Sequence, residues 1–239
     1  NLYKYIKYFN DEIDKLKKFK NKSSKIIYFS SIHVYENFKL KPSSPKNILH
    51  SKTHYSIRNI TCENILIKKF KRSPNEIQIL RIANIFGIPS NSRINKRHQM
   101  FKLSINEFCL KVVNENRVEI NSSINETRNF VSINDFINFI QISFVKKKIK
   151  FPTIINYAYN KTFTIKEIIK MIKKSSKKLL IKKPIFKYKN KLKKSKMNFY
   201  FDVKEIKKNR VNPVLSIENE IFKLIRELNI QNWNDNKFI

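Results

Sequence analysis

Hydrophobic positions in the first third of the chain follow a helical period and then a strand pattern. Residues 2–20 carry apolar side chains at helical spacing, which predicts an amphipathic helix. Residues 25–31 are a short β-rich run that ends in two serines, and this pattern predicts a buried strand. A second helix is predicted from 53 to about 70, and a second strand over 77–82. Strand, helix and strand in this order predict a βαβ unit with parallel strands.

The same alternation continues along the rest of the chain. Prolines and serines in 36–52 and basic residues in 90–99 predict two long loops. The lysine-rich segment 173–196 predicts a strand within a solvated basic loop. The remaining predicted helices lie near 100–114, 134–144, 165–174 and 216–229, and the remaining strands at 117–120, 128–132 and 153–156. Together these elements predict the α/β class with a parallel sheet, for which the family resemblance given below implies a Rossmann-like arrangement.

The net charge of the chain is large, but it changes this picture only a little. The 239 residues are 41% hydrophobic, enough for a core, and carry a formal charge of +33 from 51 Lys+Arg against 18 Asp+Glu. Taken alone, this charge indicates a polyanionic partner such as nucleic acid. However, Lys, Asn, Ile, Phe and Tyr share AT-rich codons, so genome bias is a sufficient cause of much of the excess. Nucleic acid is therefore kept only as an alternative partner, while attraction to phosphate-bearing ligands is still expected.

Glycine is nearly absent from the sequence. Gly87 is the single glycine, whereas average usage would give about 17. A complete dinucleotide-binding domain needs several glycines in its first phosphate loop, and the sequence contains no G-x-G-x-x-G. Because the chain also begins with Asn1 rather than Met, we expect its N-terminal part to be missing.

The cysteines and histidines point to no metal site. Cys62 and Cys109 lie far apart without a CxxC spacing, so they are expected to be buried thiols in a reducing compartment. His50 and His54 are four residues apart but fall in a predicted loop and helix start. No uninterrupted apolar run approaches 18 residues and no signal peptide is visible, so we expect a cytoplasmic protein without a membrane partner.

Polar side chains stand where the predicted parallel strands end. The first strand ends in Ser30 and Ser31, the second is followed by Asn84, and the helix between them begins at Tyr55. Ligands of α/β proteins bind at the carboxyl ends of parallel strands, so these groups are candidates for one cleft. The alternative is that the serines cap a loop and that Asn84 holds a turn.

Five segments resemble one family, in that family's order. Residues 26–35 resemble the V-x-x-S-S-x-x-V-Y-G segment of the extended short-chain dehydrogenase/reductases, which are nucleotide-sugar epimerases, dehydratases and reductases. Residues 54–63 resemble Y-x-x-S-K-x-x-x-E, and 79–89 resemble L-R-x-x-N-x-Y-G-P. Residues 127–135 resemble x-R-D-F-V-x-V-x-D, and 156–168 resemble N-x-G followed by (T/S)-x-x-E-L. The resemblance covers nearly the whole chain.

The resemblance implies a domain organisation. Residues 1–150 would be the C-terminal part of a doubly wound, NAD(P)-binding domain that lacks its glycine-rich first half. Some segments from about 88–130 would belong to the substrate lobe. Composition shifts most clearly after residue 150, and 151–239 would form a smaller mixed α/β substrate-binding lobe.

The resemblance also assigns site residues. Ser31 would hydrogen-bond the sugar oxygen at the reacting carbon, and Tyr55 would be the acid/base that moves the hydroxyl proton. Asn84 would bind the phosphates of the nucleotide sugar, and Arg128 would pair with a phosphate, unless it is a surface ion-pair partner.

Asn59 is the departure from the family pattern. The family has a lysine there, whose charge lowers the pKa of the tyrosine and which holds the nicotinamide ribose. Asn59 supplies no charge, although its amide could bond a ribose hydroxyl, so Tyr55 and Asn59 remain the cofactor-binding candidates. Arg58 is not expected to replace the lysine, because it points about 100° away from Asn59 around the helix.

We therefore expect a nucleotide-sugar epimerase, dehydratase or reductase that uses NAD or NADP in surface-polysaccharide or sugar-nucleotide metabolism, with a homodimer as the candidate assembly. This chain alone, without the glycine-rich loop, is expected to be inactive. One alternative is a catalytically silent relative that binds a nucleotide sugar, and another is a basic nucleic-acid-binding protein. A steep dependence of binding on salt would mark the nucleic-acid alternative.

Overall fold

The structure is a computed structural model that describes residues 2–19, 25–35, 43–47, 49, 53–89, 104–146, 148–188 and 200–237. The chain divides into two compact units that interleave along the sequence. Unit 1 contains 1–83, 149–158 and 200–212, and unit 2 contains 84–148, 159–199 and 213–239. Sequence analysis placed one boundary after residue 150, and its assignment of a cofactor domain and a substrate lobe stays a prediction.

Unit 1 is built on a parallel sheet. Its strands are β1 (Ile26–Ser31), β2 (Ile77–Ile82) and β7 (Ile154–Tyr157), in the order β1-β2-β7. Ser31 is in register with Ile82, so the carboxyl ends of β1 and β2 lie at the same edge of the sheet. The predicted parallel βαβ unit is confirmed.

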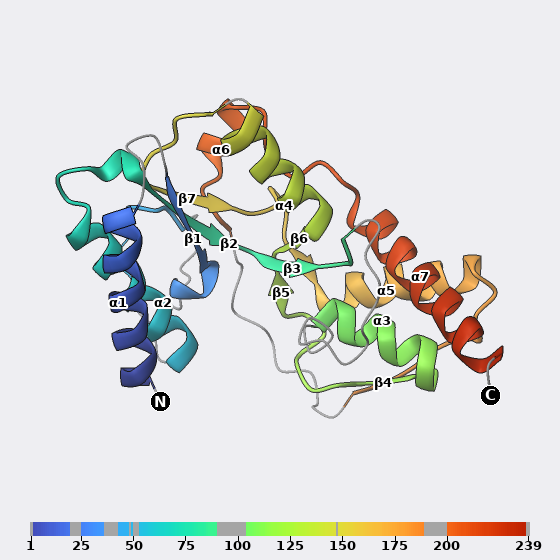
Figure 1. Cartoon of the computed structure of the whole chain (residues 1–239). Helices are drawn as coiled ribbons and strands as arrows, with labels where there is room; N and C mark the ends of the chain where they lie inside the picture. Colours follow the sequence, from blue (N-terminus) through green and yellow to red (C-terminus); the bar gives the residue numbers. More distant parts are fainter. Residues whose placement is uncertain are drawn as a thin grey trace. The chain divides into compact units, whose positions relative to one another are not determined.

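Two helices pack together beside this sheet (Figure 1). They are α1 (Leu2–Phe19) and α2 (His54–Lys69), and an ion pair joins Lys69 to Asp14 across them. Their apolar sides form a core with β2, made of Ile13, Leu66, Phe70, Ile77 and Ile79. The start of α2 is fixed by Thr53, whose hydroxyl oxygen accepts the Ser56 N–H over 3.2 Å. Tyr55 is therefore held in the first turn of α2.

Three short helices complete the described part of unit 1. Two are 3-10 turns, η1 (Ile32–Val34) directly after β1 and η2 (Pro74–Glu76) directly before β2. The third is α6 (Lys204–Lys208), which sequence analysis missed because five residues are too few to show a helical period.

Unit 2 is a mixed α/β unit. Among the residues described it contains three pairs of strands, two parallel (β3-β6 and β4-β9) and one antiparallel (β5-β8). The strands are β3 (Asn84–Phe86), β4 (Arg117–Ile120), β5 (Thr127–Arg128), β6 (Phe130–Ser132), β8 (Phe163–Thr164) and β9 (Ile185–Tyr188). The helices are α3 (Ser104–Glu115), α4 (Ile133–Ile140), its π-helical continuation η4 (Gln141–Lys146), α5 (Ile165–Lys178) and α7 (Ile217–Lys237).

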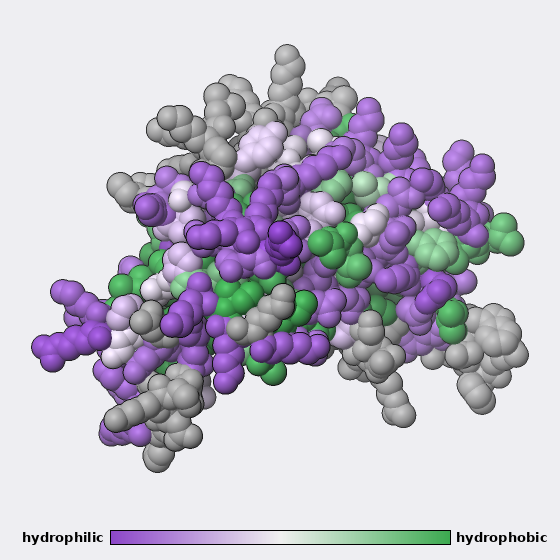
Figure 2. All heavy atoms as spheres, turned by 90° about the horizontal axis from the view of Figure 1, so that it is seen from above, coloured by the Kyte–Doolittle hydropathy of each residue, from purple (hydrophilic) through white to green (hydrophobic). Residues whose placement is uncertain are grey.

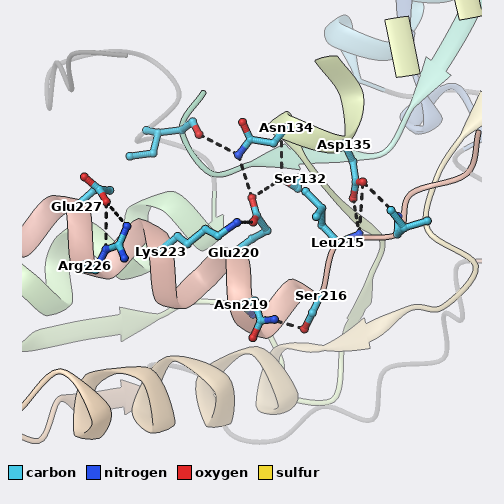
Figure 3. A network of polar contacts seen from close by, with 12 residues as sticks. Ser132, Asn134, Asp135, Leu215, Ser216, Asn219, Glu220, Lys223, Arg226 and Glu227 are labelled. Carbon is cyan, nitrogen blue, oxygen red and sulfur yellow. Dashed lines mark hydrogen bonds and ion pairs between the residues drawn. The ribbon is translucent and has the colours of Figure 1, made fainter. Parts of the chain in front are cut away.

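The core of unit 2 lies where α3, α5 and α7 pack together, and a buried polar cluster anchors the first turn of α7 (Figure 3). The Ser132 hydroxyl and the Asn134 amide donate to one carboxylate oxygen of Glu220 over 2.7 and 3.0 Å, and Lys223 donates to the other over 2.7 Å. Burial acts to raise the pKa of Glu220, but these three bonds hold it below its ordinary value. Asp135 accepts the N–H groups of Val214 and Leu215, and so holds the segment before α7.

The described part of the chain agrees with the predicted α/β class. The predicted loop over 90–99, most of the loop over 36–52 and the end of the basic segment 173–196 lie outside the described residues. Figure 2 shows one face, on which hydrophilic residues predominate and hydrophobic ones form small patches. No helix in the described ranges has the length and apolar character that a bilayer crossing requires.

Candidate functional site

Ser31 is the last residue of β1, and its side chain is buried. Its hydroxyl oxygen accepts the His33 N–H over 3.2 Å and so caps the 3-10 turn η1. Ser31 thus has the capping role that sequence analysis named as the alternative to a site role. Because a hydroxyl group that accepts one hydrogen bond keeps a donor hydrogen, capping leaves the proposed contact with a sugar oxygen chemically open.

Tyr55 presents its phenol to the surface from the first turn of α2. The residue is 49% exposed, and its ring lies 6.3 Å from the His33 ring in an edge-on arrangement. Since His33 comes two residues after Ser31, this contact places the Tyr55 ring beside the segment that leaves β1. A partly exposed phenol next to the carboxyl end of a parallel strand fits the position that sequence analysis predicted for a ligand-facing group.

Asn59 is turned into the protein. The residue is 4% exposed, and its amide oxygen accepts the Tyr28 hydroxyl over 2.9 Å. Its amide nitrogen donates to the backbone carbonyl of Tyr55, also over 2.9 Å. Burial raises the pKa of Tyr28, with a further rise from Cys62, so Tyr28 stays a protonated donor in this bond. Both ends of the Asn59 amide are therefore used within unit 1.

Arg58 lies closer to Tyr55 than the helical geometry suggested. Its guanidinium carbon is 5.2 Å from the centroid of the Tyr55 ring and 4.8 Å from that of Tyr5 on α1. The backbone direction of Arg58 differs from that of Asn59, but the long side chain reaches back over the first turn of the helix. Sequence analysis considered only the backbone direction of Arg58 and did not predict this contact with the Tyr55 ring.

A buried ion pair lies one turn further along α2. Glu63 accepts hydrogen bonds from the Arg81 guanidinium on β2, the shortest over 2.6 Å, and from the Ser30 hydroxyl on β1 over 2.5 Å. Arg81 also donates to the Tyr35 hydroxyl over 2.8 Å, which in turn donates to Asn156 on β7 over 2.8 Å. Burial acts to lower the pKa of Arg81, but the bonds and charge of Glu63 raise it above its ordinary value. This network ties α2 to the strands and so fixes the helix that carries Tyr55.

Asn84 and Arg128, the predicted phosphate ligands, lie close together within unit 2. The Asn84 amide donates to the carbonyl of Asn129, the residue after Arg128, over 2.9 Å. Arg128 forms an ion pair with Glu126 over 2.7 Å and donates to the Thr127 carbonyl over 3.2 Å. Its side chain is 28% exposed, so the guanidinium remains partly accessible. Asn129 is buried and bonds to Tyr159 and Lys161, so this corner of unit 2 is well fixed.

The residues present fit a nicotinamide cofactor poorly at the point where the family carries its lysine. The resemblance requires a group at position 59 that reaches a ribose hydroxyl, whereas the Asn59 amide is buried and bonded at both ends. Sequence analysis missed Tyr28 as the partner of Asn59, because no periodicity shows which strand residue faces which helix residue.

The described residues contain no group of His, Cys, Asp and Glu that could hold a metal ion. Cys62 and Cys109 are free and buried, as predicted, and burial raises the pKa of both thiols.

Comparison with known proteins gives a match in structure but not in sequence. No family model matches the chain, and no curated protein matches it. The UDP-glucuronic acid 4-epimerase of Bacillus cereus, solved with UDP-glucuronic acid and NAD, is 19% identical with a TM-score of 0.75. The match covers 93% of this chain and 67% of the epimerase.

Two further solved structures are similar over the same share of this chain. TunA, an NAD-dependent NDP-hexosamine 5,6-dehydratase involved in tunicamycin biosynthesis, is 15% identical with a TM-score of 0.73, over 93% of this chain and 68% of TunA. RMD from Pseudomonas aeruginosa, solved with NADPH, is 13% identical with a TM-score of 0.73, over 93% of this chain and 72% of RMD. This chain thus spans about two thirds of the length of such relatives. The chain therefore shares its fold with this epimerase and this dehydratase.

Proposed function

We propose that this chain is part of an NAD(P)-dependent oxidoreductase that acts on a nucleotide sugar as an epimerase, dehydratase or reductase. The observation that carries the proposal is the half-exposed Tyr55 phenol at the start of α2, beside the segment that follows β1. In a fold whose solved examples include an epimerase with UDP-glucuronic acid and NAD, this is the group that can exchange a proton with a sugar hydroxyl. NAD and NADPH in the solved relatives support either cofactor.

In this proposal the two units have separate tasks. In unit 1, Ser31 donates a hydrogen bond to the sugar oxygen while Tyr55 moves its proton. In unit 2, Arg128 exchanges its ion pair with Glu126 for a phosphate of the nucleotide, and Asn84 supports it. A guanidinium that already holds a carboxylate has the geometry that a phosphate oxygen also accepts.

Turnover of the full-length protein with NAD or NADP and a panel of UDP-, GDP- and dTDP-sugars tests this function. Tyr55→Phe removes the proton but keeps the ring, so turnover should fall about 100-fold or more. The affinity for the nucleotide sugar, measured by calorimetry, should change little. Tyr8→Phe is the matched control, because Tyr8 is 64% exposed on α1 and should leave turnover unchanged. Equal turnover of the Tyr55 and Tyr8 variants would refute the role of Tyr55.

Asn59 favours a second candidate function, a catalytically silent relative that binds a nucleotide sugar. An amide bonded to Tyr28 and to the Tyr55 carbonyl supplies neither the charge nor the ribose contact of the family lysine. Asn59→Lys separates the two candidates. The enzyme proposal fails if the wild type binds a UDP-sugar without turnover and Asn59→Lys produces none. Tight binding to DNA or RNA that weakens steeply with salt, without any binding of nucleotide sugars, would favour the basic nucleic-acid-binding alternative.

Two features of the cellular protein belong to the same proposal. We infer a cytoplasmic location, which cell fractionation tests, and a homodimer formed through α1 and α2. Exposed apolar side chains on these helices support the dimer, namely Leu16, Ile57 and Ile67. Sedimentation should give twice the mass of one chain, and a charged residue at Ile67 should shift it to the monomer.

A further inference from the structure

The chain departs from the family motif at two adjacent positions. Where the motif Y-x-x-S-K has a serine and a lysine, this sequence has Arg58 and Asn59. One positive charge is thus lost at position 59 and one is gained at position 58. The arrangement of the two side chains in unit 1 shows whether the second change offsets the first.

The guanidinium of Arg58 lies between two aromatic rings. Its central carbon is 4.8 Å from the ring centroid of Tyr5 on α1 and 5.2 Å from that of Tyr55 on α2. Both distances are within the range of about 6 Å over which a cation is attracted to the face of a ring. The ring of Tyr5, on the neighbouring helix, thus helps to keep the Arg58 guanidinium at the Tyr55 ring.

The charge of Arg58 is not neutralised by a carboxylate. Within the ranges that the structure describes, Arg58 has no ion pair, and its buried Nε atom has no hydrogen-bond partner. The field of this charge extends along α2 to Cys62. Burial raises the pKa of the Cys62 thiol, and Arg58 acts in the opposite direction. Within the described residues, a cation without a carboxylate partner therefore stands over the Tyr55 ring, whereas Asn59 is neutral and bonds to the Tyr28 hydroxyl and the Tyr55 carbonyl.

We propose that Arg58 is a positioning residue that takes over the electrostatic task of the absent lysine. It holds the Tyr55 ring and stabilises the negative charge that forms when the phenol passes its proton to a substrate oxygen. In that step the phenol O–H bond breaks, its electron pair stays on Tyr55, and the proton goes to the substrate. His33, whose ring meets the Tyr55 ring in an edge-on arrangement, is a second titratable side chain beside Tyr55. This inference rests on the proposed role of Tyr55, but it can be tested without measuring turnover.

Nitration by tetranitromethane tests that claim directly. The reagent attacks the ionised phenol, so its rate at Tyr55, followed by peptide mass spectrometry, reports how well the surroundings stabilise that form. Arg58→Met should slow nitration of Tyr55 about two- to fivefold, because a cation near the ring favours the ionised phenol and solvent screens much of that attraction at a half-exposed site. Nitration of Tyr8 should not change. Arg58→Lys, which keeps the charge, should retain most of the wild-type rate, and Arg72→Met, the same change at an exposed arginine of unit 1, should retain all of it.

Turnover, where it is found, adds a second readout. Arg58→Met should lower kcat with little change in KM, and Arg58→Lys should restore most of the loss. Absence of turnover in the wild type would refute the proposed function but leave the nitration result decisive for Arg58. The inference itself is overturned if Tyr55 in the Arg58→Met variant is nitrated at the wild-type rate. It is also overturned if Arg58→Lys lowers the nitration rate as much as Arg58→Met does. Melting curves followed by circular dichroism confirm that the compared variants are folded.

Discussion

The hydroxyl group of Tyr28 donates a hydrogen bond to the amide oxygen of Asn59 over 2.9 Å. The bond joins β1 to α2 at the position where the family motif has its lysine. Asn59 also donates to the Tyr55 carbonyl one turn earlier, so it links the strand to the turn that carries the candidate phenol. The asparagine is thus a structural residue in this chain, with its polar atoms satisfied in a buried place.

Tyr28→Phe should destabilise unit 1. The substitution leaves the buried Asn59 oxygen without its donor, and an unsatisfied buried acceptor costs about 1–3 kcal/mol. Urea denaturation followed by circular dichroism measures the loss in the free energy of unfolding. Tyr8→Phe removes a hydroxyl from a residue that is 64% exposed, and its effect should stay within about 0.5 kcal/mol. A Tyr28 variant as stable as the Tyr8 control would contradict the structural role of the bond.

Glu63→Gln should lower the free energy of unfolding far more than Tyr28→Phe, by about 3–5 kcal/mol, because it leaves a buried guanidinium without its carboxylate. The Glu63 and Arg81 side chains are 1% and 3% exposed, and the shortest distance between their charged atoms is 2.6 Å. The matched control is Glu227→Gln, which breaks the exposed pair with Arg226 and should cost less than about 1 kcal/mol. Urea denaturation of both variants checks the contrast. Similar losses in the two variants would show that burial does not set the strength of the pair.

The parts of the fold that were predictable are those in which the chain itself carries a period. Helix α1 and strands β1 and β2 lie within a residue or two of their predicted bounds, since each buries one face or both. The parallel pairing followed from the βαβ order. In contrast, no separate strand was predicted over β3, which pairs with β6 in a different sheet. Pairing between segments about 45 residues apart leaves no local pattern in the sequence.

The sequence motifs name a set of candidate site residues, which stays a prediction, but they do not give the contacts of those residues. Motif order pointed to Tyr55 and Ser31, which lie near each other through His33. The direction of Arg58 was misjudged because helix geometry fixes the Cα–Cβ bond, whereas four further torsions of arginine allow the guanidinium to return to Tyr55. The pairing of Arg128 with Glu126 also depends on side-chain conformation rather than on spacing.

The pH dependence of stability should depend on Asp135. Burial raises the pKa of this carboxyl above its ordinary 3.8, the N–H groups of Val214 and Leu215 act to lower it, and the charge of Glu220 raises it further. An acid with a raised pKa in the folded state holds its proton more tightly there than in the unfolded chain. Its favourable contribution is therefore complete below pH 3.8 and is lost as the pH rises through the folded value.

Asp135→Asn should remove this slope. Relative to the variant, the wild type should lose free energy of unfolding as the pH rises from about 4 towards neutrality. Urea denaturation at a series of pH values, with both proteins in the same buffers, gives the two slopes. Parallel curves over this range would show that Asp135 titrates alike in the folded and unfolded chains.

The C-terminal end of α5 shows how a helix of this glycine-poor chain ends without a glycine. Helices often end in a residue with left-handed backbone, usually glycine, and this signal helps to locate the end in a sequence. Here Leu180 has that conformation, with φ of 55°, while its N–H donates to the Lys177 carbonyl and the Ile181 N–H to the Ser176 carbonyl. Without the glycine signal, the predicted end of this helix fell four residues short of Lys178.

Leu180→Gly should therefore stabilise the protein by about 1 kcal/mol. A left-handed backbone costs a residue with a Cβ atom about 1–2 kcal/mol, and part of the gain is offset by the greater freedom of glycine in the unfolded chain. Loss of the leucine side chain should cost little, because it is 94% exposed. Leu180→Ala separates the effect of the side chain from that of the backbone, because it removes the same exposed side chain but keeps the Cβ atom. It should change the free energy of unfolding by less than about 0.5 kcal/mol. Thermal and urea unfolding measure both variants, and an equal change in the two would show that the backbone at Leu180 stores no strain.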